Sequence, residues 1–129
     1  QVFSSNVWTG FPLANFAQAE PANRAPALWL FPGAAFNLSQ TSDPDEQNKF
    51  REILKEARAL VLDDFFRSQP QIVIVDTHSE KSHFNGASFD YLDFFQQEEA
   101  FSSAWSEYHL SGRVLHFEVY ARAGCDGAV

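Results

Sequence analysis

Four side chains with acid–base or ligand-binding chemistry lie close together in this sequence. Asp76 ends an apolar, β-branched run, and His78, Lys81 and His83 follow it within a polar segment. Open α/β sheets bind their ligands beyond the carboxyl ends of the strands, so this segment is the first candidate site. A carboxylate and an imidazole there can ligate Zn²⁺, exchange protons, or hold a small ligand or glycan. The structural alternative is that the carboxylate caps a turn or a helix.

No motif of established spacing surrounds these residues. The sequence lacks His-Glu-x-x-His, and its single cysteine, Cys125, excludes both an internal disulfide and a zinc site built from paired thiolates. It also lacks a glycine-rich dinucleotide fingerprint, a phosphate loop and a Gly-x-Ser-x-Gly nucleophile elbow. We therefore assign no catalytic residue, no metal ligand and no cofactor to this chain.

Arg24 and Trp8 are the candidate contact residues outside that segment. Arg24 stands just before the apolar run Ala27–Phe31, where a cation can bind an anionic head group or pair with an acid such as Asp76. Tryptophan can stack on a sugar ring, although aromatic side chains usually fill the core. Trp8 has the least constrained surroundings, so we expect it to make a surface contact. The remaining tryptophans are expected in the core: Trp29 and Trp105.

Apolar patterns predict the strands that position these residues. The predicted strands are Val2–Ser5, Ala27–Phe31, Gln71–Val75, and a C-terminal β-hairpin of Tyr108–Val114 with Phe117–Arg122. The hairpin turn is expected at Leu115-His116 or at Ser111-Gly112. The run at 71–76 shows no alternation, which is typical of a central strand that is buried on both faces.

Helical periodicity is clearest over Pro44–Ser68. Ser42 is the expected N-cap, Asp45 completes a capping box, and Pro44 fits the first turn. The apolar stripe that should face the sheet is Phe50, Ile53, Leu54, Ala57, Leu60, Val61 and Phe65. Other predictions are a short helix over Leu13–Gln18, a polar connection over Asn37–Ser42, a turn at Asn85-Gly86, and two short helices or one kinked helix over 89–108.

These elements predict one α/β domain over residues 1–122 and a frayed tail over 123–129. We expect a mixed sheet of about five strands with helices on both faces, which is a three-layer sandwich. The formal net charge of −8 excludes a general nucleic-acid binder and disfavours electrostatic adhesion to anionic lipid. No run approaches the ~18–20 apolar residues that cross a bilayer. The chain starts at Gln1 rather than Met, as expected for a domain excised from behind membrane helices.

Four segments carry a resemblance to a known family. They are Asn23–Gly33, Pro70–Asp76, Phe89–Phe95, and Gly112–Val114 followed by Phe117–Arg122. In order and spacing they resemble the soluble C-terminal region of bacterial polytopic membrane glycosyltransferases of the GT-C type, the class related to protein mannosyltransferases and aminoarabinose transferases. The similarity spans about Val7 to Arg122. Asn23-Arg24 stands where the family usually has a Ser-Arg pair, and the Gly-Cys-rich ending lies outside the pattern.

The resemblance implies a polyprenyl-phosphate sugar donor and a catalytic acid in a membrane-proximal loop that has no counterpart here. It therefore implies a non-catalytic accessory domain on the periplasmic side of the bacterial inner membrane, within a multi-pass protein. The implied partners are the membrane-embedded part of the same polypeptide and a lipid-linked sugar or glycan acceptor. The alternative is a free-standing α/β domain that binds a small ligand, or acts as an enzyme, through the loop 76–83.

Overall fold

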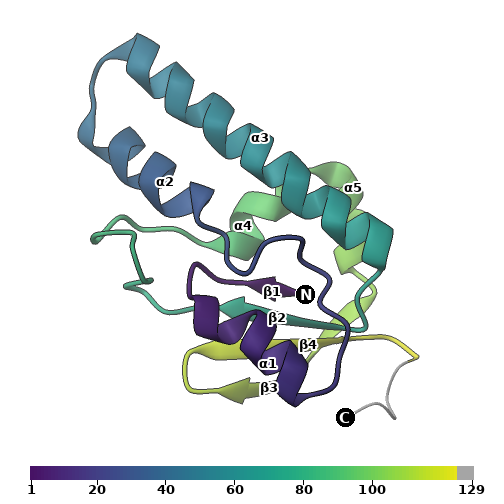
Figure 1. The fold of residues 1–129 in the computed structure, drawn as a ribbon. Helices are drawn as coiled ribbons and strands as arrows, with labels where there is room; N and C mark the ends of the chain where they lie inside the picture. Colours follow the sequence, from purple (N-terminus) through teal and green to yellow (C-terminus); the bar gives the residue numbers. More distant parts are fainter. Residues whose placement is uncertain (125–129) are drawn as a thin grey trace.

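The computed structural model describes residues 1–124, apart from the side chain of Phe11. Its sheet has four strands in the order β1-β2-β4-β3: β1 (Val2–Phe3), β2 (Ile72–Asp76), β3 (Tyr108–Val114) and β4 (Phe117–Arg122) (Figure 1). β1 runs parallel to β2, whereas β4 is antiparallel to both β2 and β3. The predicted α/β class and mixed sheet are therefore confirmed. The prediction of a frayed tail falls mostly on residues outside the described range, Cys125 among them.

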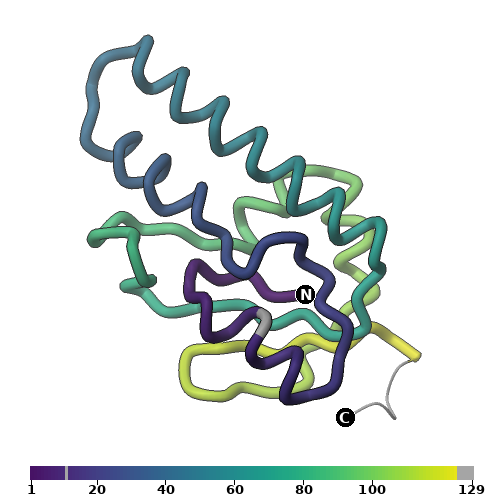
Figure 2. Tube along the Cα trace, in the orientation of Figure 1, coloured from purple at the N-terminus to yellow at the C-terminus, as the bar shows by residue number. Residues whose placement is uncertain are grey.

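The helices follow the chain between the strands. They are η1 (Val7–Thr9), α1 (Phe11–Phe16), α2 (Leu30–Gln40), α3 (Pro44–Ser68), α4 (Tyr91–Gln96) and α5 (Glu99–Trp105). The α2–α3 hairpin projects past the end of the sheet, at the upper left of the trace (Figure 2). Among the described residues, none of the helices combines the length and the apolar character that a membrane span requires.

Several predicted elements are confirmed. Helix α3 and both arms of the hairpin have the predicted bounds, and 89–108 contains two short helices. The hairpin turn lies at Leu115-His116, where Leu115 has a left-handed φ of 54°. The other expected position of the turn, Ser111-Gly112, is instead a β-bulge between Leu110 and Gly112. Asn85 and Gly86 form the predicted turn, with φ of 50° and 85°.

The predicted strand at Ala27–Phe31 is wrong, which leaves four strands instead of five. Leu30 begins α2, and Pro32 lies in its first turn, where a backbone N–H would have no helical partner in any case. The proline therefore helps to begin a helix and does not end a strand. The predicted polar connection at Asn37–Ser42 is also largely wrong, because α2 continues to Gln40.

The segment 23–28, which includes the start of the predicted strand, nevertheless runs beside the sheet. The Asn23 side-chain amide donates to the Val2 carbonyl at 2.9 Å and accepts from the Val2 N–H at 2.8 Å. The Leu28 N–H donates to the Ser4 carbonyl at 2.9 Å. These three bonds occupy the outer edge of β1 without forming a regular ladder. The apolar residues at 27–28 are buried, as the pattern requires.

The core lies between one face of the sheet and helices α2–α5. Phe3, Val73 and Val75 are at most 2% exposed, and the Phe3 ring lies 4.7 Å from that of Phe95. Ile72 and Ile74, on the opposite face, are only partly buried. The three-layer sandwich and a central strand buried on both faces are therefore not confirmed. On α3 the predicted stripe is largely correct, but Leu60 is 47% exposed.

Asp43, and not Ser42, caps the start of α3. Its side chain accepts a hydrogen bond from the Asp45 N–H at 2.9 Å, and its carbonyl accepts from the Gln47 N–H. The assignment of Ser42 misplaced the cap by one residue, because Pro44 is the first helical residue and the cap directly precedes it.

We predict that Asp43→Ala lowers the free energy of unfolding by about 1 kcal/mol, since it removes the acceptor at the helix N-terminus. Ser42→Ala is the matched control and should change stability by less than about 0.5 kcal/mol. Urea denaturation followed by circular dichroism measures both variants. Equal losses in the two variants would contradict the assignment of the cap.

Candidate functional site

The carboxyl ends of the parallel strands β1 and β2 meet, and a buried polar cluster lies there. Ser4 and Ser5 follow β1, and Asp76 ends β2; all three are buried. The Ser4 hydroxyl donates to Asp76 Oδ2 at 3.1 Å. The predicted position beyond the strand ends is therefore where the structure gathers polar groups.

The loop after β2 folds back over these strand ends. The His78 N–H donates to Asp76 Oδ1 at 3.0 Å, and Lys81 Nζ donates to the His78 carbonyl at 2.7 Å. The Ser5 hydroxyl donates to the Ser82 carbonyl at 2.6 Å. Three of the predicted site residues, Asp76, His78 and Lys81, are thus linked by hydrogen bonds. In that arrangement the Asp76 carboxylate shapes the loop, as the structural alternative predicts.

Lys81 and Tyr91 are the buried titratable groups beside Asp76. Burial lowers the pKa of Lys81, while the carboxylates of Asp76 and Asp90 oppose that shift. Burial also raises the pKa of Tyr91, whose ring centroid lies 5.8 Å from Lys81 Nζ. Within the described part of the chain, the Tyr91 hydroxyl has no hydrogen-bond partner of good geometry. The cluster therefore brings the amine of Lys81, the carboxyl group of Asp76 and the phenol of Tyr91 together beyond the strand ends.

The imidazoles of this region lie at the surface. His78 packs edge-on against His116 from the β3–β4 turn, with ring centroids 4.7 Å apart, and its Nδ1 accepts from the Glu80 N–H at 2.9 Å. His83 is exposed and has a left-handed φ of 70°. Among the described residues, no hydrogen bond or ring contact joins the side chains of His83 and Trp8 to the cluster.

Arg24 lies elsewhere, at the C-terminal end of α3. Its N–H donates to Asp64 Oδ2 at 2.9 Å and its Nε donates to Asp64 Oδ1 at 2.6 Å, while Nη2 pairs with Asp63. Pairing with an acid was one of the two predicted roles, but the expected partner Asp76 is wrong. The sequence does not reveal the partner, because α3 must first pack beside segment 23–28.

Asp64 is only 4% exposed, yet it stays ionised. Burial alone would raise its pKa, but hydrogen bonds from the Arg24 backbone and side chain and from Arg67 outweigh burial and lower the pKa below its ordinary value. Arg67 Nη2 donates to Asp64 Oδ1 at 2.7 Å. A buried carboxylate with three such donors is a structural anchor.

The distribution of the tryptophans between core and surface differs from the prediction. Trp8 is 79% exposed on η1, as expected for a contact residue, and Trp105 is buried. Trp29 was expected in the core but is 55% exposed, because it precedes α2 and does not lie inside a strand. Two tryptophans are therefore available at the surface.

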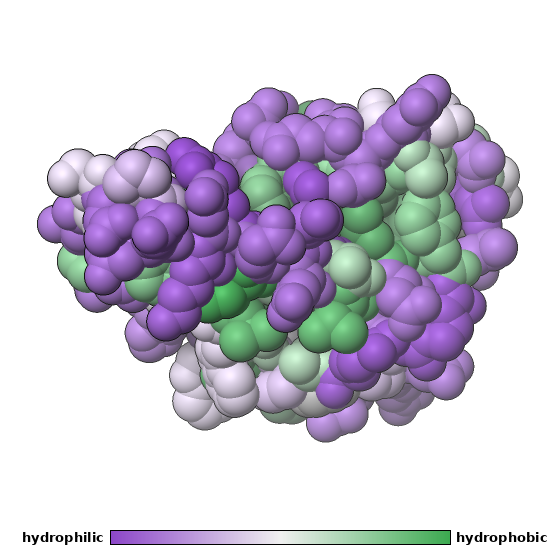
Figure 3. Space-filling model, turned by 90° about the horizontal axis from the view of Figure 1, so that it is seen from above, coloured by the Kyte–Doolittle hydropathy of each residue, from purple (hydrophilic) through white to green (hydrophobic). Residues whose placement is uncertain are grey.

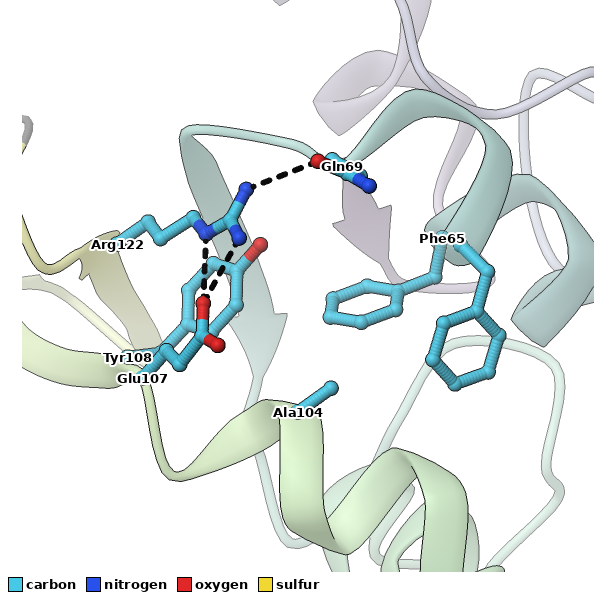
Figure 4. A pocket seen from close by; sticks show the side chains of 7 residues that line it. Phe65, Gln69, Ala104, Glu107, Tyr108 and Arg122 are labelled. Carbon is cyan, nitrogen blue, oxygen red and sulfur yellow. Dashed lines mark hydrogen bonds and ion pairs between the residues drawn. The ribbon is translucent and has the colours of Figure 1, made fainter.

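A small cavity of about 210 Å³ lies between α3, α5 and the hairpin (Figure 4). Phe65 and Ala104 form its apolar side. On its polar side, Arg122 Nε donates to Glu107 Oε2 at 2.9 Å, and Arg122 Nη1 donates to Gln69 Oε1 at 3.2 Å. These polar groups bind one another, so the hydrogen-bonding groups of the cavity wall already have partners within the wall.

The residues that the sequence interpretation missed are Ser4, Ser5, Tyr91 and His116. The two serines end the predicted strand Val2–Ser5 and directly follow the observed strand β1, so the rule that selected Asp76 would also have selected them. Tyr91 and His116 carry no such signal, because they approach the cluster only through the packing of α4 and the hairpin turn.

We predict that Asp64→Asn lowers stability at pH 7 by about 1–3 kcal/mol, because it removes a buried acceptor of charged donors. The folded-state pKa of Asp64 is lowered, so its contribution is present above the ordinary carboxyl value of about 3.9 and is lost as pH falls through the folded value. The difference between wild type and variant should therefore shrink below about pH 4. Urea denaturation from pH 7 to pH 2 measures this. The exposed neighbour, in Asp63→Asn, should lose less stability, and a difference that persists undiminished at pH 2 would refute the prediction.

A second prediction concerns the strand-end cluster. Asp76→Asn should cost about 1–3 kcal/mol, because it removes a buried carboxylate that accepts hydrogen bonds from Ser4 and the His78 N–H and that interacts electrostatically with Lys81. Glu80→Gln, an exposed carboxylate of the same loop, is the control and should change stability by less than about 0.5 kcal/mol. Thermal unfolding of the wild type and of both variants measures these changes in stability. An unchanged stability of Asp76→Asn would mean that the carboxylate is not a structural residue.

The described residues contain no group of three or more His, Cys, Asp or Glu side chains placed to hold a metal ion. No protein-family model, no curated protein and no solved structure matches this chain.

Proposed function

We propose that this chain is a non-catalytic accessory domain of a polytopic bacterial membrane glycosyltransferase of the GT-C type, located on the periplasmic side of the inner membrane. The reacting sugar is carried on a polyprenyl phosphate, and the catalytic acid belongs to the membrane portion. This domain contributes to the shape of the cleft for the donor or the glycan acceptor. The resemblance of the four segments is the basis for the family.

A non-catalytic role is best supported by the hydrogen bonds and ion pairs that the candidate ionisable residues make within the domain. Asp76 accepts from Ser4 and from the His78 N–H, Lys81 donates to the His78 carbonyl, and Arg24 pairs with Asp64. Each of these candidate residues is engaged by another part of the same domain. Such bonds stabilise a scaffold, whereas a group that takes part in a reaction must be able to reach a substrate.

The segment Asn23–Leu28 is a second support, because it belongs to the first of the four resembling segments. It joins β1 through Asn23 and Leu28, and α3 through Arg24. These residues therefore act together in holding the fold, which is a structural role that does not require catalysis. Trp8 and Trp29 are exposed and could contact a sugar ring or the membrane-embedded part of the polypeptide.

We predict that removal of this domain from the full-length membrane protein lowers sugar transfer in isolated membranes. The purified 129-residue chain should transfer nothing. The assay measures transfer from a polyprenyl-phosphate sugar to the acceptor, with membrane levels of the protein matched by immunoblotting. Sugar transfer by the purified chain would overturn the proposal, as would a complete gene that encodes no hydrophobic segments.

A further inference from the structure

A groove on this domain lies away from the strand-end cluster. It has a volume of about 540 Å³ and lies between the α2–α3 hairpin and the segment 88–97. Pockets that bind small molecules typically measure about 300–1,000 Å³. The groove contains none of the residues of the strand-end cluster, so its role does not depend on the proposed function.

The interior of the groove is apolar. Its apolar lining side chains belong to α2, α3 and the segment around α4, and they are Ala35, Leu38, Leu54, Phe89 and Phe94. Leu54 and Ala35 are buried, while Leu38, Phe89 and Phe94 are partly exposed. Partly exposed leucine and phenylalanine side chains that converge on one groove offer an apolar surface to a ligand.

The wall formed by α3 is cationic, which is unusual for this chain. Three of the 9 Lys and Arg residues line the groove, namely Arg51, Lys55 and Arg58, but only one of the 17 Asp and Glu residues, Glu52, does so. The face of the molecule seen from above is mainly hydrophilic, with apolar side chains near its middle (Figure 3). The groove is therefore a local cationic site on an acidic domain.

The three cations differ in how firmly they are held. Arg58 pairs with Glu98 at 2.6 Å and lies over the Phe94 ring at 4.7 Å, so it fixes the groove wall. Arg51 donates to the neutral side chains of Asn48 and Gln47 at 3.3 Å, and Lys55 lies 3.8 Å from Glu52, with both side chains 67% exposed. Such exposed contacts are weak and are easily exchanged for a ligand.

We propose that this groove binds a small anionic amphiphile: an alkyl chain or aromatic ring that carries one phosphate or carboxylate group. The apolar part lies along Leu38, Phe89 and Phe94. The anionic group meets Arg51 and Lys55, which exchange their weak contacts for a charge-assisted bond. Phosphate and carboxylate share this chemistry, and probes with each head group distinguish them.

The test uses the purified chain and simple probes below their micelle concentrations. Decyl phosphate and decanoate supply the anion and the chain, decyltrimethylammonium supplies the same chain with a positive charge, and inorganic phosphate supplies the anion alone. Calorimetry gives the Kd, and backbone amide shifts locate the site. Non-specific attraction to a chain of net charge −8 would favour the cationic probe, whereas binding in the groove would favour the anionic probes. The two explanations therefore predict opposite orders of affinity.

We expect at least one anionic amphiphile to bind about tenfold more tightly than decyltrimethylammonium, with amide shifts on α2, α3 and 88–97 and none for inorganic phosphate. Lys55→Glu should weaken that binding about tenfold, because it replaces attraction by repulsion. Lys49→Glu is the matched control on the same helix, outside the groove, and should weaken it less than about twofold. Tighter binding of the cationic probe, shifts confined to other elements, or equal effects of the two variants would overturn the proposal.

Discussion

The Asp64 carboxylate attaches the irregular segment between α1 and α2 to the rest of the domain. It accepts from the Arg24 N–H, from Arg24 Nε and from Arg67. An ionised carboxylate at 4% exposure is unfavourable without such partners, so the carboxylate and its donors must come together. Because Arg24 is fixed there, the chain can run along β1 and enter α2 with Phe31 facing the core. The positions of α2 and of the groove beside it both follow from this contact.

Aromatic contacts between distant segments provide the second constraint. Phe31 of α2 packs at 5.7–6.1 Å against Phe89, Tyr91, Phe94 and Phe95, while Phe65 of α3 lies 4.9 Å from Phe101 of α5. Helices as short as α4 and α5, with 6 and 7 residues, do not form alone in water. The aromatic core therefore holds them, and it draws on a chain that has no Met and 14 Phe. Two of these rings, Phe89 and Phe94, also line the groove.

The elements that local patterns determine were predictable, and those that depend on tertiary contacts were not. The amphipathic stripe of α3 and the alternation of β4 gave correct bounds, since each pattern persists over several turns or residue pairs. The run Ala27–Phe31 is apolar in either state, so periodicity could not separate a strand from a buried connection that leads into a helix. At the strand ends, Asp76, His78 and Lys81 were found because they lie close together in the sequence. Tyr91 and the partner of Arg24 come from distant positions, and no sequence spacing brings them together.

The side chain of Asn23 has a consequence for the behaviour of the domain in concentrated solution. Its amide satisfies both backbone groups of Val2, and Leu28 satisfies the Ser4 carbonyl. A strand with free backbone groups at the border of a sheet is a template on which another polypeptide can add by β-augmentation. Here that border is blocked by one amide side chain and one backbone bond, not by a further strand. The domain thus resists intermolecular sheet growth at β1 through the same short segment that connects α1 to α2.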